Sequence, residues 1–219
     1  MKNIILSLLL LATSTHALGQ VGINGAYYTF TANEWTDLLN ELTGQNFDNA
    51  TGYQVGVDYW LRLETKRIEF FPEISYAALN SNSGNSEIDI TLLGFHLNTN
   101  IYPFDFDGDC DCPTWSKSGS IFEKGFFFQI SPGYNRGEIK VADENVQGDE
   151  TFNYFHLGIG AGLDIGISDL ITVTPLVKYY YSTSVEYGPT SLSTIDYSPA
   201  ESNIRQFYAG VRLGLRFNE

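Results

Sequence analysis

The residues with the most distinctive chemistry lie in one short run, Asp105-Phe106-Asp107-Gly108-Asp109-Cys110-Asp111-Cys112-Pro113. Closely alternating carboxylates are typical of Ca²⁺ ligands. Their spacing differs from that of an EF-hand loop, because Ser116 stands where a bidentate Glu would be needed. The candidate cation-binding residues are therefore Asp105, Asp107, Asp109 and Asp111.

The two cysteines of this run, Cys110 and Cys112, are separated by one residue. In an oxidising compartment they could form a tight, strained disulfide or ligate a soft metal such as copper or zinc. Two thiolates alone are too few for a closed zinc site. Three alternatives stay open: a local disulfide or rigid acidic turn, a metal site, and a site for a periplasmic partner. We expect no resident cofactor, with Ca²⁺ or a soft metal at this turn as the alternative.

The histidines give little support for catalysis. His16 lies in a predicted leader, and His96 and His156 are both predicted to face inward. A serine hydrolase of the lipid A deacylase kind would need a Ser and an acid near a His on the outer surface. The sequence contains no such local grouping, so we predict that the chain is not an enzyme. A lipid-modifying enzyme is the alternative, and it would depend on His156.

Other charged residues recur at every second position of long alternating stretches. The clearest stretch is Phe207 to Phe217, where Arg212 and Arg216 share the face opposite the apolar one. Alternation of this kind predicts a β-strand with two different environments. The charged residues on such faces are Asp58, Arg62, Glu69, Glu73, Asp164, Lys178, Arg212 and Arg216. Because buried charges persist only when paired, we predict an interior ion network that closes the protein rather than an open pore.

The alternating stretches are eight in number and define an all-β chain. They begin at Val21, Tyr53, Arg67, Ile88, Gly125, Tyr154, Leu170 and Phe207. In the fourth stretch Ile88 and Ile90 are out of phase with Leu93, which predicts a bulge near Leu92. Polar loops are expected over 80–87, 136–151 and 185–203, and a long irregular connection over 104–123. Long connections after every odd strand favour an antiparallel up-and-down transmembrane barrel with short periplasmic turns and longer extracellular loops.

One short helix is predicted in the first loop. Asn33 is a candidate N-cap, Gly44 is a candidate stop, and the apolar residues between them follow helical spacing. These apolar residues are Trp35, Leu38, Leu39 and Leu42. Packing on the barrel rim and binding of a partner are the two interpretations of this stripe.

The N-terminus predicts export. Lys2, the apolar stretch 4–12 and Ala17-Leu18-Gly19 have the order of a signal peptide, so we expect 1–19 to be removed and 20–219 to form a single barrel domain. No later apolar run approaches the roughly 20 residues of a membrane helix. A net charge of −14 argues against nucleic-acid binding. Two aromatic girdles would account for Tyr27, Tyr28, Tyr53, Tyr59, Trp60, Tyr76, Tyr102, Tyr134, Tyr179, Tyr180 and Tyr181.

Together, the leader, the eight alternating strands and the aromatic terminal strand resemble the small OmpA/OmpX-type barrels. They resemble in particular the PorT-like outer-membrane β-barrel domain family of Bacteroidota. The resemblance covers Val21 to Phe217 and implies a location in the outer membrane of a Gram-negative cell envelope. Members of that family include structural proteins, adhesins and accessory parts of secretion or uptake machines.

We therefore expect an outer-membrane structural or interaction barrel with a closed interior, acting as an accessory subunit of a secretion, uptake or adhesion complex. Its expected partners are outer-membrane lipid and another envelope protein, bound through the loops or the 104–123 turn. A small channel or transporter is the functional alternative. A soluble exported β-sandwich is the architectural alternative.

Overall fold

The computed structural model describes residues 20–63, 66–106, 114, 119–143, 147–188 and 198–216. The predicted signal peptide lies outside these residues. So do both cysteines and three of the four candidate cation ligands, Asp107, Asp109 and Asp111.

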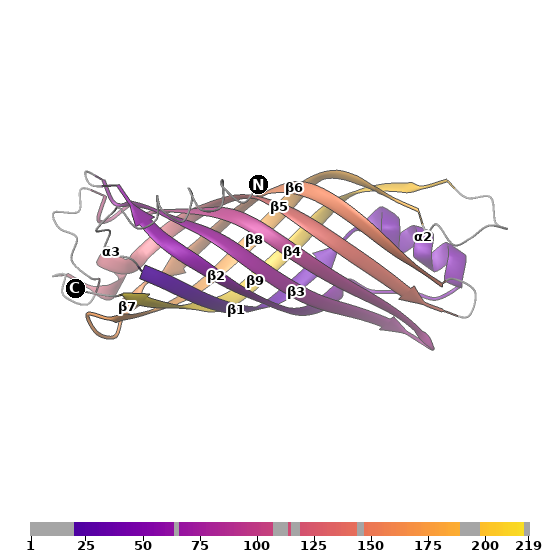
Figure 1. Cartoon of the computed structure of the whole chain (residues 1–219), viewed down its shortest axis with the longest axis horizontal. Coiled ribbons are helices and arrows are strands. Elements are labelled where there is room, and N and C mark those ends of the chain that lie inside the picture. Colours follow the sequence, from indigo (N-terminus) through magenta and orange to yellow (C-terminus); the bar gives the residue numbers. More distant parts are fainter. Residues whose placement is uncertain are drawn as a thin grey trace, which may run out of the picture.

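The described chain forms a closed, antiparallel, eight-stranded β-barrel (Figure 1). Its strands are β1 (Gln20–Thr31), β2 (Ala50–Arg62), β3 (Ile68–Ser83), β4 (Ser86–Ile101), β5 (Phe126–Ala142), β6 (Gln147–Leu163), β8 (Ile171–Tyr187) and β9 (Ala200–Arg216). Two-residue β7 (Ile165–Gly166) continues β6 along the edge of β8. Each strand pairs with its neighbours in sequence, and the pairings β1–β9 and β6–β8 close the barrel. The predicted fold class is confirmed.

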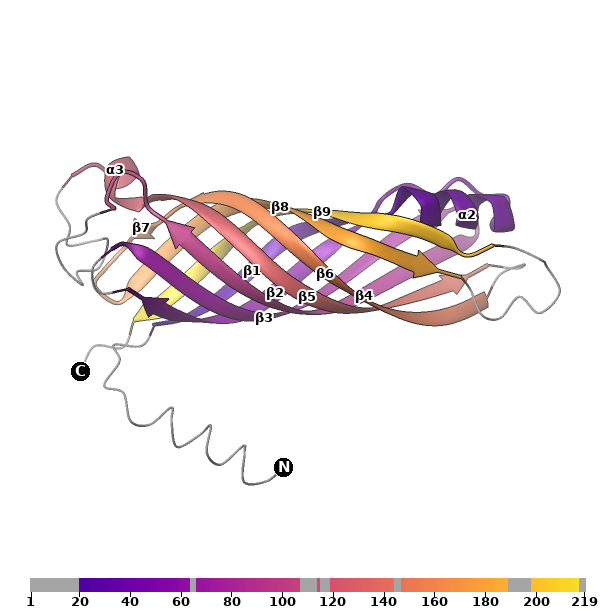
Figure 2. The same cartoon turned by 90° about the horizontal axis from the view of Figure 1, so that it is seen from above.

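The two ends of the barrel carry different elements. Helix α2 (Asn33–Thr43) joins β1 to β2 at one end, and α3 (Ile121–Gly125) precedes β5 at the other (Figures 1 and 2). The start of β1 and the end of β9 pair with each other at the α3 end. In an up-and-down membrane barrel this end is periplasmic, so α2 lies at the outer end. No helix in the described ranges is long and apolar enough to cross a membrane.

An exposed apolar belt surrounds the barrel. Ile74 on β3, Phe155 on β6 and Val211 on β9 are 63%, 66% and 49% exposed, and similar residues face outward from every long strand. The belt also contains the outward tyrosines Tyr27, Tyr53, Tyr59, Tyr76, Tyr134, Tyr179 and Tyr181. A soluble protein would bury this much contiguous apolar surface, whereas a membrane barrel presents it to lipid.

The girdle prediction was wrong for four aromatic residues. Tyr28, Trp60, Tyr102 and Tyr180 are between 0% and 7% exposed and fill the interior. Their neighbours in sequence hold the outward positions. Period-2 alternation places adjacent tyrosines, such as Tyr179 and Tyr180, on opposite faces.

At the outer end of the barrel the inward positions are apolar and the outward positions are polar, the reverse of the arrangement at the level of the belt. On β4, Leu93 and Phe95 face outward, but Ile88 and Ile90 are 4% and 3% exposed and point inward. The outward positions beside them are occupied by polar residues such as Asp89. The outer end therefore has a polar surface and an apolar core, as a soluble protein does.

This reversal corrects the predicted bulge near Leu92. The β3–β4 register runs without a shift from Ile68↔Ile101 to Ser83↔Ser86. The change of hydrophobic phase reflects a change in the surroundings of the strand and not an extra residue. A register shift does occur elsewhere, between Tyr181 and Ser184 of β8.

The same reversal explains why three loops are shorter than predicted. Polar residues at 80–87 continue β3 and β4 to a turn at residues 84–85, where Gly84 has a φ of 60°. In the same way β5 and β6 extend to Ala142 and back to Gln147, and β8 and β9 extend to Tyr187 and from Ala200. Polar outward residues above the membrane have the composition of a loop although they form strands.

Candidate functional site in the barrel interior

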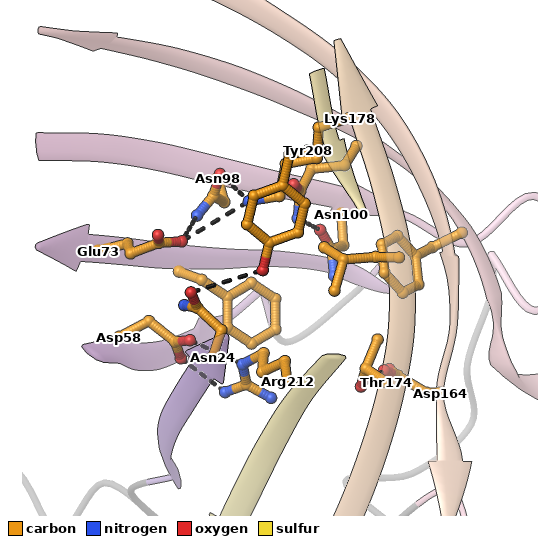
Figure 3. A pocket seen from close by; sticks show the side chains of 14 residues that line it. Asn24, Asp58, Glu73, Asn98, Asn100, Asp164, Thr174, Lys178, Tyr208 and Arg212 are labelled. Atoms are coloured by element: carbon orange, nitrogen blue, oxygen red, sulfur yellow. Dashed lines mark hydrogen bonds and ion pairs between the residues drawn. The ribbon is translucent and has the colours of Figure 1, made fainter. Parts of the chain in front are cut away.

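Buried ion pairs and hydrogen bonds fill the membrane-level interior (Figure 3). A bidentate pair joins β2 to β9: Arg212 Nε and Nη2 donate to the two carboxylate oxygens of Asp58 at 2.8 and 2.6 Å. Gly22 on β1 leaves room for this pair, because a Cβ there would lie 2.4 Å from both side chains. The paired geometry satisfies charges that would otherwise be costly inside a barrel.

A second cluster is centred on Glu73 of β3. Its carboxylate accepts hydrogen bonds from Gln54 Nε2 at 3.2 Å and Asn98 Nδ2 at 2.6 Å. Lys178 Nζ lies 3.7 Å from the same carboxylate, and Glu73 and Lys178 are 2% and 3% exposed. Strands β2, β3 and β4 are thereby connected across the interior, with β8 supplying the cation.

At the periplasmic end, Arg67 forms a latch across the barrel floor. Its guanidinium lies over the Tyr102 ring at 3.8 Å, and its Nε lies 3.4 Å from Glu69. The same group pairs with Asp105 and donates to the carbonyl of Lys124. Because Arg67 belongs to the β2–β3 connection and both Asp105 and Lys124 belong to the β4–β5 connection, the latch fixes part of the long turn over the end of the barrel.

Asp164 lies at the same end of the barrel and accepts hydrogen bonds from the hydroxyl groups of Tyr102 and Thr174. Tyr102 donates to Asp164 at 2.6 Å and lies 3.0 Å from Glu69, so one hydroxyl lies between two carboxylates. Thr174 also donates to Asp164.

A hydrogen-bonded chain crosses the interior above the ion pairs. Ser75 Oγ lies 2.9 Å from His96 Nε2, and His96 Nδ1 lies 3.1 Å from His156 Nε2. These residues are 5%, 1% and 6% exposed. Ser75, His96 and His156 are therefore grouped in the barrel interior, although they are far apart in the sequence. They link β3, β4 and β6 and do not face lipid.

Helix α2 fills the outer end of the interior. Trp35 and Leu39 are each 2% exposed, and Trp35 Nε1 donates to the Val185 carbonyl at 3.1 Å. The Trp35 ring lies 5.0 Å from that of Phe152 and 5.2 Å from that of Tyr187. Leu38 and Leu42 pack at the edge of the same cluster, so the apolar stripe of α2 is covered by its own barrel.

A second contact holds the start of α2. Ser202 Oγ on β9 donates to the Glu34 carboxylate, and this hydrogen bond is the main reason why the pKa of Glu34 is lowered from its ordinary value. The helix ends at Thr43, and Gly44 after it adopts a left-handed φ of 69° as predicted from its type. The N-cap prediction was wrong, because Ala32 holds that position and Asn33 is the first helical residue.

The interior is almost completely filled. The cavity among the ion-paired side chains measures about 20 Å³, room for roughly one water molecule. A cavity of similar size, about 20 Å³, lies beneath α2. In the described structure, side chains thus occupy the path between the two ends.

The predicted ion-network residues fall into two groups. Asp58, Glu69, Glu73, Asp164, Lys178 and Arg212 are buried in the interior. Arg62 and Arg216 are half-buried near the periplasmic end. Arg62 stands opposite Glu69 in the β2–β3 register, and Arg216 lies 5.2 Å from the Trp60 ring.

Several interior residues were missed from sequence. Arg67 shares a face with Glu69, and that spacing was a usable signal, but its partner Asp105 is distant in sequence. Neutral groups such as Asn98 and Gln129 also lie inside, and the predicted network of charges did not include them. Of the candidate cation ligands, Asp105 is described, and it faces Arg67. In the described ranges no three His, Cys, Asp or Glu side chains are grouped to hold a metal.

These features define a closed, eight-stranded, transmembrane β-barrel of the outer-membrane type. Neisserial surface protein A has a similar fold, with a TM-score of 0.52 and 11% identity over 92% of this chain and 98% of that one. The attachment invasion locus protein Ail of Yersinia pestis aligns over 91% of this chain and 100% of its own, with 12% identity and a TM-score of 0.43. No protein-family model and no curated protein matches the sequence.

Proposed function

We propose that this protein is a non-conducting barrel of the outer membrane that serves as a structural and interaction subunit of a cell-envelope complex for secretion, uptake or adhesion. The observation that carries the proposal is the filled interior. Buried ion pairs occupy the membrane level, α2 occupies the outer end, and the Arg67 latch lies at the periplasmic end. A barrel with this interior offers its outer surfaces and ends for recognition.

The outer end supplies the first surface for a partner. Its outward positions on β3 to β5 form a polar collar, defined here as Asn80, Glu87, Asp89, Glu138 and Lys140. Within the collar, Asn80 donates to Glu87 at 2.7 Å and to Asp89 at 2.9 Å, so the side chains are held in place. Ordered polar groups on extended strands present a fixed pattern that a partner can recognise. The 104–123 turn is the second proposed surface.

Affinity purification from native membranes in mild detergent tests the interaction role. The variants are Glu87→Lys/Asp89→Lys in the collar, a chain shortened within 107–118, and Glu201→Lys as a control on a different outer strand. We expect an envelope protein to co-purify with the wild type and the control and to be lost from one of the other two. An identical set of co-purifying proteins in all four samples would contradict the proposal.

A further inference from the structure

Four phenylalanines form an aromatic ladder at the periplasmic end: Phe104, Phe122, Phe126 and Phe128. The ring centroids of Phe104 and Phe122 are 5.5 Å apart, those of Phe122 and Phe126 are 4.9 Å apart, and those of Phe126 and Phe128 are 5.1 Å apart. Phe104, Phe122 and Phe128 are 58%, 53% and 54% exposed. The ladder is thus a continuous apolar surface that begins in the long turn and ends on β5.

The end of this ladder that lies on β5 is part of the apolar belt. Phe128 faces outward on β5, followed two residues later by Ile130, which is 43% exposed. The aromatic ladder continues the belt without a break. Because the belt faces lipid, we expect the same lipid to cover the ladder. Aromatic side chains are favoured at the boundary between headgroups and acyl chains.

Other connections at the same end also carry exposed apolar residues beside their polar ones. Leu63 after β2 is 44% exposed, and Ile167 and Leu170 before β8 are each 52% exposed. At the outer end the corresponding strand ends carry polar residues such as Asn82 and Glu87. From this asymmetry we expect one boundary of the bilayer to lie at the periplasmic connections. The other boundary then crosses the strands before they reach their outer ends.

Helix α3 is suited to contact with lipid, because a capping box pairs two of the amides at its start. Ser120 and Glu123 form a capping box: Ser120 N donates to Glu123 Oε2 at 2.9 Å, and Glu123 N donates to Ser120 Oγ at 3.2 Å. Unsatisfied amides are costly near hydrocarbon. With these amides paired, Phe122 and the 51% exposed Ile121 can enter an apolar layer.

We propose that the aromatic ladder and α3 lie in the boundary layer of the periplasmic leaflet, so that phospholipid and not a protein covers this part of the 104–123 turn. The proposal rests on the membrane location proposed above. It assigns the turn a role in seating the barrel at a fixed depth, and it limits partner binding to the remainder of the turn and to the outer end.

Photo-crosslinking tests the proposal. p-Benzoylphenylalanine is introduced at position 122 of the full-length protein in native outer membranes, with matched sites at Ile159 in the belt and Asn82 in the outer turn. All three side chains are exposed, so the barrel should fold, which is checked by its resistance to detergent before heating. Adducts are identified by mass spectrometry.

We expect phospholipid adducts at positions 122 and 159 and none at position 82. A lipid adduct at 159 together with a protein adduct, or no adduct, at 122 would overturn this inference while leaving the membrane location intact. Absence of lipid adducts at both 122 and 159 would overturn the membrane location and this inference with it.

Discussion

At the scale of single residues, stability depends on pairing charges that the membrane does not solvate. Asp58 and Arg212 are 3% and 8% exposed and satisfy each other through two hydrogen bonds. A buried pair of this kind adds little over a well-packed apolar pair, but removing one partner leaves an uncompensated charge. Sequence alternation was sufficient to place both residues inside. Their pairing could not be predicted, because it depends on the register of β1 between β2 and β9.

Replacing Asp58 by Ala should therefore reduce the free energy of unfolding by about 3–5 kcal/mol, because Arg212 stays buried without its partner. The double variant Asp58→Leu/Arg212→Met should recover most of this loss. Urea unfolding in lipid vesicles measures both. A single variant as stable as the wild type would show that the pair does not contribute to folding.

The space beside this pair gives a second residue-level prediction. Gly22→Ala should cost about 1–3 kcal/mol, because the added methyl group would lie 2.4 Å from Arg212 and Asp58. Gly25 lies on the same strand, and a Cβ added there would meet nothing within 4 Å, so Gly25→Ala is a matched control that should leave stability nearly unchanged. Equal effects in the two variants would mean that interior space at Gly22 is not limiting.

At the scale of elements, α2 acts as the core of the outer end. Its apolar stripe was predicted correctly from helical spacing, with Trp35 and Leu39 buried and Leu38 and Leu42 half-buried. Its place inside the barrel could not be predicted, because the sequence does not reveal that Ile88, Ile139 and their neighbours turn inward at the outer end. The inversion of the two faces and the docking of α2 depend on each other. The inward apolar residues at the outer end have to be covered, and the apolar stripe of α2 covers them.

Trp35→Ala should cost about 3–5 kcal/mol in the stability of the outer end, since it removes a large buried ring and leaves the Val185 carbonyl without this donor. Protease cleavage within 31–50 should accelerate, while Glu41→Ala on the exposed face of α2 should behave as the wild type. Unchanged cleavage in Trp35→Ala would indicate that the helix is held by other contacts.

At the scale of the whole molecule, the sequence predicted the barrel and its strand number, because both depend on the local alternation of apolar and polar residues. It did not predict the extent of the strands beyond the membrane. The polar ends of β3 and β4 have the composition of a loop, and only pairing across the hairpin identifies them as strands. The Arg67 latch was missed for the same reason, since its partners come together only when the barrel closes.

The position of the membrane belt can be tested with charge. Val211→Arg places a cation at an outward position that is 49% exposed in the belt, and it should reduce stability by about 2–4 kcal/mol if that position lies near the bilayer midplane. Glu201→Arg on the same strand lies above the belt and should insert normally. Folding into vesicles, followed by the gel mobility of the folded form, compares them, and equal yields would place the belt elsewhere.

We propose that the barrel crosses the membrane without a conducting path, because its interior holds ion pairs and a cavity of only about 20 Å³. Conductance across a planar lipid bilayer tests this most directly, after insertion has been verified by protease protection in matched vesicles. We expect a current indistinguishable from that of the bare bilayer. Steady, reproducible single-channel steps from the wild-type protein would contradict it.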